Sequence, residues 1–302
     1  MHTNVPGAPA VRAAFAALID YAGLYPPAQL PMADSVSEYI AAGAGSHAWM
    51  LGRFIVPASR LNELLTMVKG KPAALSVIVD AGIDPRSWLP NVQNSLTHIA
   101  HLHSNETRVR VEALEITLAP LQTNRETYDA AIGQFAAAAQ QAGLRDVPAF
   151  VELPRDSRRE ALLPGAMYAL ARHRLGGKVR CGGVTAQATP QPIEIASFIA
   201  NATEEGVAYK ATAGLHHPIR HFNEEAGFVM HGFLNVLVAS LRARHGATIE
   251  QLEAVIASEN PAQLQLDEDA GEVQAMRRES FIAYGSCSFS EPIEDLQSLG
   301  LL

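Results

Sequence analysis

The sequence is poor in cysteine, in basic residues and in long apolar runs, and each shortage excludes a class of protein. Only two cysteines, Cys181 and Cys287, occur in 302 residues, whereas a secreted domain stabilised by disulfides needs more. The 23 lysines and arginines are outnumbered by 31 acidic residues, for a net charge of −8. This balance argues against nucleic acid or an anionic membrane surface as the main partner.

Targeting signals are lacking as well. Residues 1–10 contain no basic stretch followed by an apolar one, and no apolar run reaches the length that crosses a bilayer. We therefore expect a cytoplasmic protein whose partner is a small molecule, not nucleic acid or a membrane.

Short apolar runs that favour strands alternate along the chain with longer helical patterns. The strand-like runs lie at 17–24, 49–56, 74–80, 109–118, 148–153, 177–182, 207–212 and 281–286. Helical patterns lie between them at 35–44, 60–68, 87–103, 125–143, 158–173 and 192–205. This alternation is typical of βαβ units with a parallel sheet, and eight such units close a barrel. The sequence therefore predicts an α/β protein with the (β/α)8, or TIM barrel, fold.

Residues 1–302 are expected to form one barrel domain, because no linker rich in glycine, serine or proline divides the chain. The interval between the seventh and eighth strands is longer than a barrel requires, and we interpret 222–278 as a helical insertion. Helical patterns lie in this interval at 231–244 and 248–258. Two interpretations of the insertion remain open: a lid over the active site, or a contact between subunits of a homo-oligomer.

Lysines on the sixth and seventh strands are the most informative polar residues. Every second side chain of a strand points inward, so Lys178 would face the interior with Arg180, and Lys210 with Thr212. Two ammonium groups about 6 Å apart repel by roughly 3 kcal/mol at an effective dielectric near 20. Such repulsion lowers the pKa of one lysine by about two units. A neutral amine attacks a carbonyl to form a Schiff base, and Glu115 on the fourth strand would move the protons.

Other interpretations of these residues remain open. The two lysines and Glu115, with Glu152 on the fifth strand, would equally form a structural ion-pair cluster in a barrel that binds a small anion without catalysis. Metal-assisted chemistry would use histidines, but the adjacent His216 and His217 point in different directions, and no spacing typical of paired metal ligands occurs. We expect no metal and no other cofactor, and keep metal-assisted chemistry as an alternative.

Several segments at strand positions resemble the deoxyribose-phosphate aldolases, class I aldolases that fold as (β/α)8 barrels. Residues 19–26 read Ile-Asp-Tyr-Ala-Gly-Leu-Tyr-Pro, similar to the family's Ile-Asp-His-Thr-Leu-Leu-Lys-Pro. Residues 178–182 and 210–215 read Lys-Val-Arg-Cys-Gly and Lys-Ala-Thr-Ala-Gly-Leu, which resemble its Lys-Thr-Ser-Thr-Gly and Lys-Ala-Ser-Gly-Gly-Ile. Residues 114–117 and 285–288 resemble its fourth and eighth strands. The segments occur in the family's order along the chain.

The resemblance implies a Schiff-base mechanism with three catalytic residues. Lys178 would form the imine, Lys210 would tune its pKa, and Glu115 would stand in for the family's proton-relay aspartate. Gly214 and Ser286 would fall where backbone N–H groups hold the substrate phosphate. The candidate substrate-binding residues around the barrel mouth are Arg180, Asp20, Glu152, Thr212, Gly214, His216, His217 and Ser286.

Departures from the family's pattern affect the substrate more than the scaffold. Arg180 replaces a small residue beside the expected nucleophile, which narrows the pocket or adds an anion clamp. Glu115 is one methylene longer than aspartate, and Ala213 replaces the first glycine of a Gly-Gly turn. We therefore predict an aldolase-like, lysine-dependent lyase that acts on a small anionic carbonyl compound, without assigning deoxyribose 5-phosphate to it.

Overall fold

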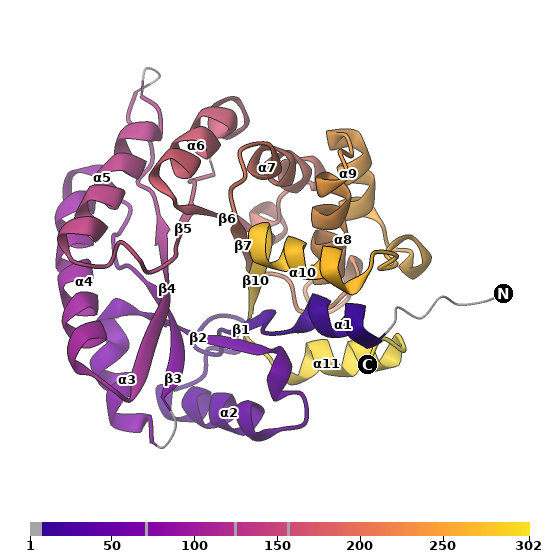
Figure 1. Ribbon diagram of the computed structural model, residues 1–302, viewed down its shortest axis with the longest axis horizontal. Helices are drawn as coiled ribbons and strands as arrows, with labels where there is room; N and C mark the ends of the chain where they lie inside the picture. The colour runs from indigo at the N-terminus through magenta and orange to yellow at the C-terminus, as the bar shows by residue number, and fades with distance from the viewer. Residues whose placement is uncertain (1–7, 70–71, 124–125, 156–157) are drawn as a thin grey trace.

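The computed structural model describes residues 8–69, 72–123, 126–155 and 158–302. Within these residues, eight parallel strands close into a barrel in the order β1-β10-β7-β6-β5-β4-β3-β2 (Figure 1). The barrel strands are β1 (Ile19–Tyr21), β2 (Leu51–Pro57), β3 (Ala73–Ile78), β4 (Val109–Thr117), β5 (Ala149–Glu152), β6 (Gly176–Arg180), β7 (Tyr209–Thr212) and β10 (Phe281–Ser286). Each strand-like run of the sequence overlaps one of them, which confirms the predicted (β/α)8 fold.

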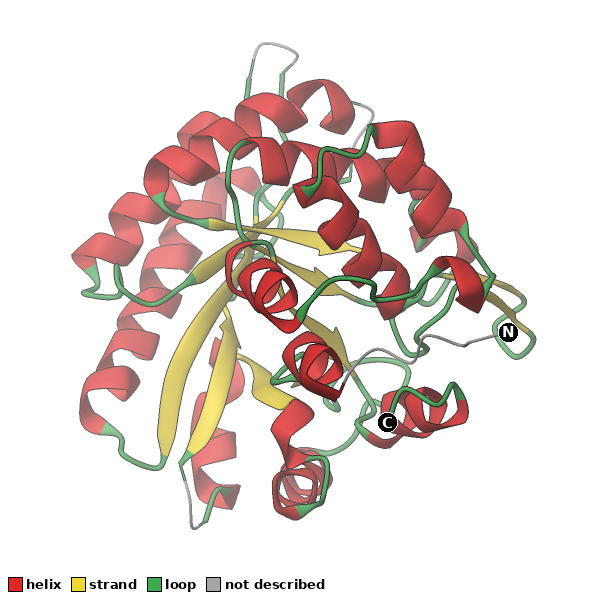
Figure 2. Ribbon diagram, turned by 45° about the vertical axis from the view of Figure 1, so that its right-hand side comes forward, coloured by secondary structure: helices red, strands yellow, loops and turns green. Residues whose placement is uncertain are grey.

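Helices lie outside the barrel strands (Figure 2). Those that follow the strands are α2 (Met32–Ala44), α3 (Leu61–Met67), α4 (Pro85–Asn105), α5 (Asp129–Gln141), α6 (Arg159–His173), α7 (Pro192–Glu204), α8 (Phe233–Arg244) and α11 (Ser290–Ser298). Local signals set their ends: Asp84 caps α4 by accepting a hydrogen bond from Arg86 N, and Pro85 begins the helix. The predicted helix at 125–143 begins later, at Asp129, and residue 125 lies outside the described residues. In the part of the chain that the structure describes, no helix is long and apolar enough to cross a bilayer.

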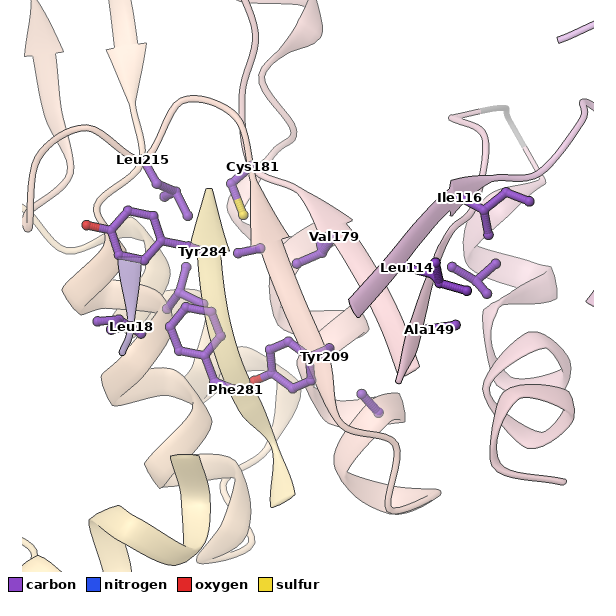
Figure 3. Close-up of a cluster of buried hydrophobic side chains, with 14 of the residues drawn as sticks. Leu18, Leu114, Ile116, Ala149, Val179, Cys181, Tyr209, Leu215, Phe281 and Tyr284 are labelled. Carbon is purple, nitrogen blue, oxygen red and sulfur yellow. The ribbon is translucent and has the colours of Figure 1, made fainter. Parts of the chain in front are cut away.

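The apolar core lies between the outer faces of the strands and the helices. Figure 3 shows Tyr209, Phe281 and Tyr284 among its buried side chains. The Tyr284 ring stacks on Phe233 of α8 with 4.9 Å between ring centroids. The Tyr209 hydroxyl lies 2.5 Å from Ser240 Oγ of the same helix. α8 is therefore the helix that packs against β7 and β10, as a regular barrel unit requires.

Further elements add to the eight units. They are α1 (Ala8–Phe15), the hairpin of β8 (His221–Asn223) and β9 (Phe228–Met230), α9 (Ile249–Ala257) and α10 (Ala270–Glu279). α9 packs against α7 and α8, and α10 packs against α1 and β10. Both helices therefore lie in the outer layer beside the barrel.

Candidate active site

The strand register brings the two lysines to the same level of the barrel. Lys178 on β6 pairs directly with Lys210 on β7 and, on its other side, with Glu152 on β5. A neighbouring inward position is a glycine that leaves room: a Cβ at Gly176 would lie 2.5 Å from the Phe150 ring. The Phe150 ring of the adjacent strand β5 therefore fills the space where Gly176 has no side chain.

Lys178 contacts two carboxylates at the mouth of the barrel. Its Nζ lies 2.8 Å from Glu115 Oε2 and 3.3 Å from Glu152 Oε2. The other oxygen of Glu152 accepts a hydrogen bond of 3.1 Å from Arg180 Nε. Predicted site residues on the fourth, fifth and sixth strands are thus joined in one network of ion pairs.

Lys210 extends this network into the barrel interior. Its Nζ lies 2.5 Å from Glu115 Oε1 and 2.5 Å from Asp20 Oδ2, and donates a hydrogen bond of 2.9 Å to Ser76 Oγ. Ser76 in turn donates to Glu115 Oε1 at 2.6 Å. Ser76 was not among the predicted residues, and its only signal in the sequence is a hydroxyl within the apolar run of the third strand.

Exposure increases along the network from the interior to the mouth. Lys210 and Glu115 are each 1% exposed, whereas Lys178 is 5% exposed. The Arg180 side chain at the end of β6 is 49% exposed. A small molecule that enters from the mouth would therefore meet Arg180 first and then Lys178, with Lys210 behind it.

Opposite charges decide the protonation states in the network. Burial alone would raise the pKa of Glu115, but the ammonium groups of Lys178 and Lys210 outweigh it and hold this pKa well below its ordinary value. Burial would likewise lower the pKa of Lys178, but the carboxylates of Glu115 and Glu152 raise it above the usual lysine value. The predicted lowering of a lysine pKa by the second lysine is therefore wrong for Lys178, because a carboxylate lies between the two ammonium groups.

Asp20 lies at the inner end of the network and has no exposed surface. Its Oδ1 accepts a hydrogen bond of 2.6 Å from Arg53 N, and its Oδ2 contacts Lys210. The Asp20 carboxylate therefore holds Lys210 and the neighbouring strand β2.

Two more predicted residues lie at the C-terminal end of β7, next to β6. Thr212 pairs with Arg180 and is partly buried. Gly214 has a φ of +70°, and a Cβ built on it would lie 2.8 Å from the Cα of Gly182. Only glycine combines this backbone conformation with so close an approach of two chains. Both residues remain candidates for contact with a substrate at the rim.

His216, His217 and Ser286 have their contacts outside the lysine network. His217 Nδ1 lies 2.6 Å from Asp295 Oδ2 of α11, and His216 Nδ1 lies 3.6 Å from Glu291 Oε2 of the same helix. Ser286 is buried, and its hydroxyl accepts a backbone hydrogen bond from the turn that follows β10. The structure therefore ties both histidines to α11 instead of joining them to the lysines.

A surface groove lies beside one of these histidines. It has a volume of about 470 Å³, and its lining includes His217, His221, Phe222, Asp295 and Leu299, with none of the lysine network. Among the described residues, no three His, Cys, Asp or Glu side chains are grouped as they would be around a metal ion.

Comparison with known proteins identifies solved structures that resemble this fold. No protein-family model matches the sequence, and no curated protein does. The structure is similar to deoxyribose phosphate aldolase from Aeropyrum pernix, a protein described as tetrameric, with a TM-score of 0.50 and 13% identity over 98% of this chain and 95% of that one. The chain has the barrel fold of that aldolase. A fructose-bisphosphate aldolase from Slackia heliotrinireducens DSM 20476 matches at a TM-score of 0.41 and 14% identity over 92% of this chain and 93% of that one.

A sequence identity of 13% shows that the two proteins share a fold and shows nothing about a shared activity. The barrel fold implied by the resemblance of the strand segments to the deoxyribose-phosphate aldolases is confirmed. The chemistry of this chain has to be argued from its own side chains.

Proposed function

We propose that this protein is an aldolase-like lyase in which Lys178 forms a Schiff base with a small carbonyl substrate. The observation that carries the proposal is the bridge in which Lys178 and Lys210 contact the two oxygens of the Glu115 carboxylate. Stability alone is a weak reason for such a bridge, because the cost of burying charges can exceed the gain from pairing them. The bridge also lies near the C-terminal ends of the strands, where barrel enzymes carry their chemistry.

Lys178 is assigned as the nucleophile because it is more exposed than Lys210, at 5% against 1%. Its raised pKa means that a proton must leave before the amine can attack. The carboxylates of Glu115 and Glu152 lie within 2.8 and 3.3 Å of Nζ and would accept that proton. The amine then adds to the carbonyl carbon, and loss of water leaves an iminium.

Glu115 would carry the next proton transfer. It would remove a proton from the carbon beside the iminium, giving the enamine that makes or breaks the carbon–carbon bond. Lys210 and Ser76 both donate to Glu115 Oε1 and so hold the carboxylate in position. Lys210 would thus act through Glu115, while Lys178 and Glu115 touch the reacting atoms.

An anionic substrate is proposed because of Arg180. Its side chain is 49% exposed at the rim, and its Nε is fixed by Glu152. A guanidinium held in this way binds a carboxylate or phosphate through its remaining N–H groups. The proposed substrate is therefore a small aldehyde or ketone with one anionic group.

Reductive trapping tests the proposal. The chain contains four lysines, Lys69, Lys71, Lys178 and Lys210, so peptide mass spectrometry locates an adduct without ambiguity. With borohydride and a panel of small aldehydes, ketones and sugar phosphates, we expect Lys178 to be modified faster than the exposed Lys69, although it is buried. Lys178→Arg should abolish the fast adduct, and the control Lys69→Arg should retain it. Slower modification of Lys178 than of Lys69 with every compound would overturn the Schiff-base proposal.

The raised pKa of Lys178 favours a second candidate, a barrel that binds a small anion without turnover. A protonated lysine next to Arg180 attracts an anion into the mouth. This candidate predicts calorimetric binding of inorganic phosphate or a small carboxylate that is lost in Arg180→Ala, with no preferential adduct on Lys178.

A further inference from the structure

The groove beside His217 is separate from the lysine network and has no part in the proposed reaction. Its lining comes from two parts of the chain, β8 with residues on either side of it and the C-terminal end of α11. Its volume of about 470 Å³ lies within the range of pockets that bind small molecules. A specific protein partner usually covers a much larger surface, so the size of the groove favours a small ligand.

The described residues that line the groove carry negative charge with no lysine or arginine among them. Glu224 and Glu225 lie at the tip of the hairpin and are exposed, and their carboxylates have no ion pair or hydrogen bond with another described residue. Arg220 is close in sequence but lies outside the lining, and its guanidinium contacts Glu259 at 2.6 Å. The charge of the groove therefore attracts a cation.

A third carboxylate places negative charge at the other end of the groove. Asp295 contacts His217 through Oδ2 at 2.6 Å, and its side chain is 35% exposed. The His217 ring packs against His221, the first residue of β8, with 4.5 Å between ring centroids. From His221 to Glu224 the extended chain advances three residues, or about 10 Å. Acceptors for positive charge therefore lie at both ends of β8.

Apolar side chains are exposed in the same groove. Phe222 lies in the middle of β8, between the two charged ends, and is 51% exposed. Leu299 directly follows α11 and is 36% exposed. Apolar side chains that gather in a concave surface mark a place where a ligand binds, and an aromatic face also attracts ammonium groups.

We propose that this groove binds a linear aliphatic diamine. One ammonium group would lie at Asp295, and the other would lie at Glu224 and Glu225. The methylene chain between them would pack against Phe222 and Leu299. A molecule with a positive charge at each end and an apolar middle is the complement of this lining, and the proposal does not depend on the Schiff-base reaction.

A matched pair of ligands isolates the second charge. Hexamethylenediamine and aminohexanol have the same length, but only the first carries an ammonium group at each end. By calorimetry at low ionic strength we expect a Kd of about 1 mM or less for the diamine, about tenfold tighter than for the amino alcohol. About twofold of this ratio is statistical, since the diamine has two equivalent ends, and the remaining factor of about five is the size of an exposed ion pair.

Two double variants with the same chemical change locate the second ammonium group. Glu224→Gln with Glu225→Gln removes the carboxylates at the hairpin tip and should reduce the ratio of the two Kd values to the statistical factor of about two. Glu204→Gln with Glu205→Gln makes the same change at the end of α7, outside the groove. This control should leave the ratio at about ten, because sites without a shared partner act independently.

Phe222→Ala tests the apolar surface between the charged ends. It should weaken both ligands about fivefold and leave their ratio unchanged, because the ring contacts the chain that the two molecules share. Tyr168→Ala removes a ring that is 58% exposed on α6 and should change neither Kd.

Several results would overturn the diamine site. They are a wild type that does not saturate at about 10 mM diamine, a wild-type ratio no larger than the statistical factor, and a full ratio that persists in the variant of the hairpin tip. An equal loss in the control at the end of α7 would also overturn it, since attraction by the overall negative charge would then explain the binding. The borohydride adduct on Lys178 is measured separately, so none of these results decides the Schiff-base proposal.

Discussion

Lys178 and Lys210 lie side by side on β6 and β7, yet their ammonium groups contact different oxygens of one carboxylate, that of Glu115, at 2.8 and 2.5 Å. A negative charge between two positive ones offsets the repulsion that the lysine pair would otherwise suffer. The stability of the barrel interior therefore depends on Glu115, and so does the reactivity of Lys178 in the proposed mechanism.

Replacing Glu115 by glutamine should destabilise the fold by about 3 kcal/mol, because it leaves buried ammonium groups with fewer carboxylates. Denaturant unfolding at neutral pH measures the change in the free energy of unfolding. Glu112→Gln is the matched control on the same strand: its side chain is 36% exposed, and the loss should be within about 1 kcal/mol. If the two variants lose the same amount, the bridge contributes no more than a surface ion pair.

Imine formation on Lys178 should become faster as the pH rises, and the rise should continue beyond pH 8. The carboxylates of Glu115 and Glu152 raise the pKa of Lys178, so the neutral amine is scarce at pH 7, and its fraction grows about tenfold per pH unit below that pKa. Glu152→Gln removes one of these carboxylates and should shift the profile to lower pH. The rate of adduct formation over a pH series measures both effects, and a wild-type plateau below pH 8 would contradict the charge states described above.

The decrease in the free energy of unfolding at low pH should depend on Glu115. Its pKa is lowered in the folded protein, so its ionic contacts contribute fully above the unfolded value of about 4.3 and are lost as the pH falls toward the folded value. Urea unfolding at several pH values should show the wild type losing stability below about pH 4, and Glu115→Gln losing less over the same range. If the wild type and Glu115→Gln lose the same stability as the pH falls, carboxylates other than Glu115 cause the loss.

Arg180→Ala should weaken the binding of anionic substrates specifically. We expect KM for an anionic carbonyl compound to rise about 10-fold, while the adduct rate with neutral propanal changes less than twofold, because only the anion contacts the guanidinium. Arg86→Ala, at a side chain that is 91% exposed and distant in sequence from the network, serves as the control for lost surface charge. An equal rise in KM for neutral and anionic compounds would assign Arg180 to the shape of the mouth instead.

The local sequence pattern was enough to predict the barrel. Where the prediction of a helix or strand was wrong, the reason also lies in the local sequence. The alternation of strand-like runs and helical stretches is present in the sequence itself, and all eight barrel strands were found from it. α10 was missed because it is strongly polar and buries only Val273 and Met276. β1 is shorter than the predicted run at 17–24, since pairing with its neighbours involves only Ile19–Tyr21.

The candidate site was likewise predicted only in part from local sequence pattern. The inward positions of Lys178, Lys210 and Glu115 follow from the two-residue period of a strand, which each segment carries by itself. Their partners do not follow, because Asp20 and Ser76 belong to β1 and β3, neither of which is adjacent to β7 in the barrel.

The sequence by itself therefore determined the fold class and which side chains of each strand face the barrel interior. Only the tertiary structure decided how those side chains pair, since long side chains from non-adjacent strands meet across the interior at distances set by closure and register. It also decided the direction of the Lys178 pKa shift. That direction depends on a carboxylate placed between two charges, and the placement is a property of the closed barrel, not of any one strand.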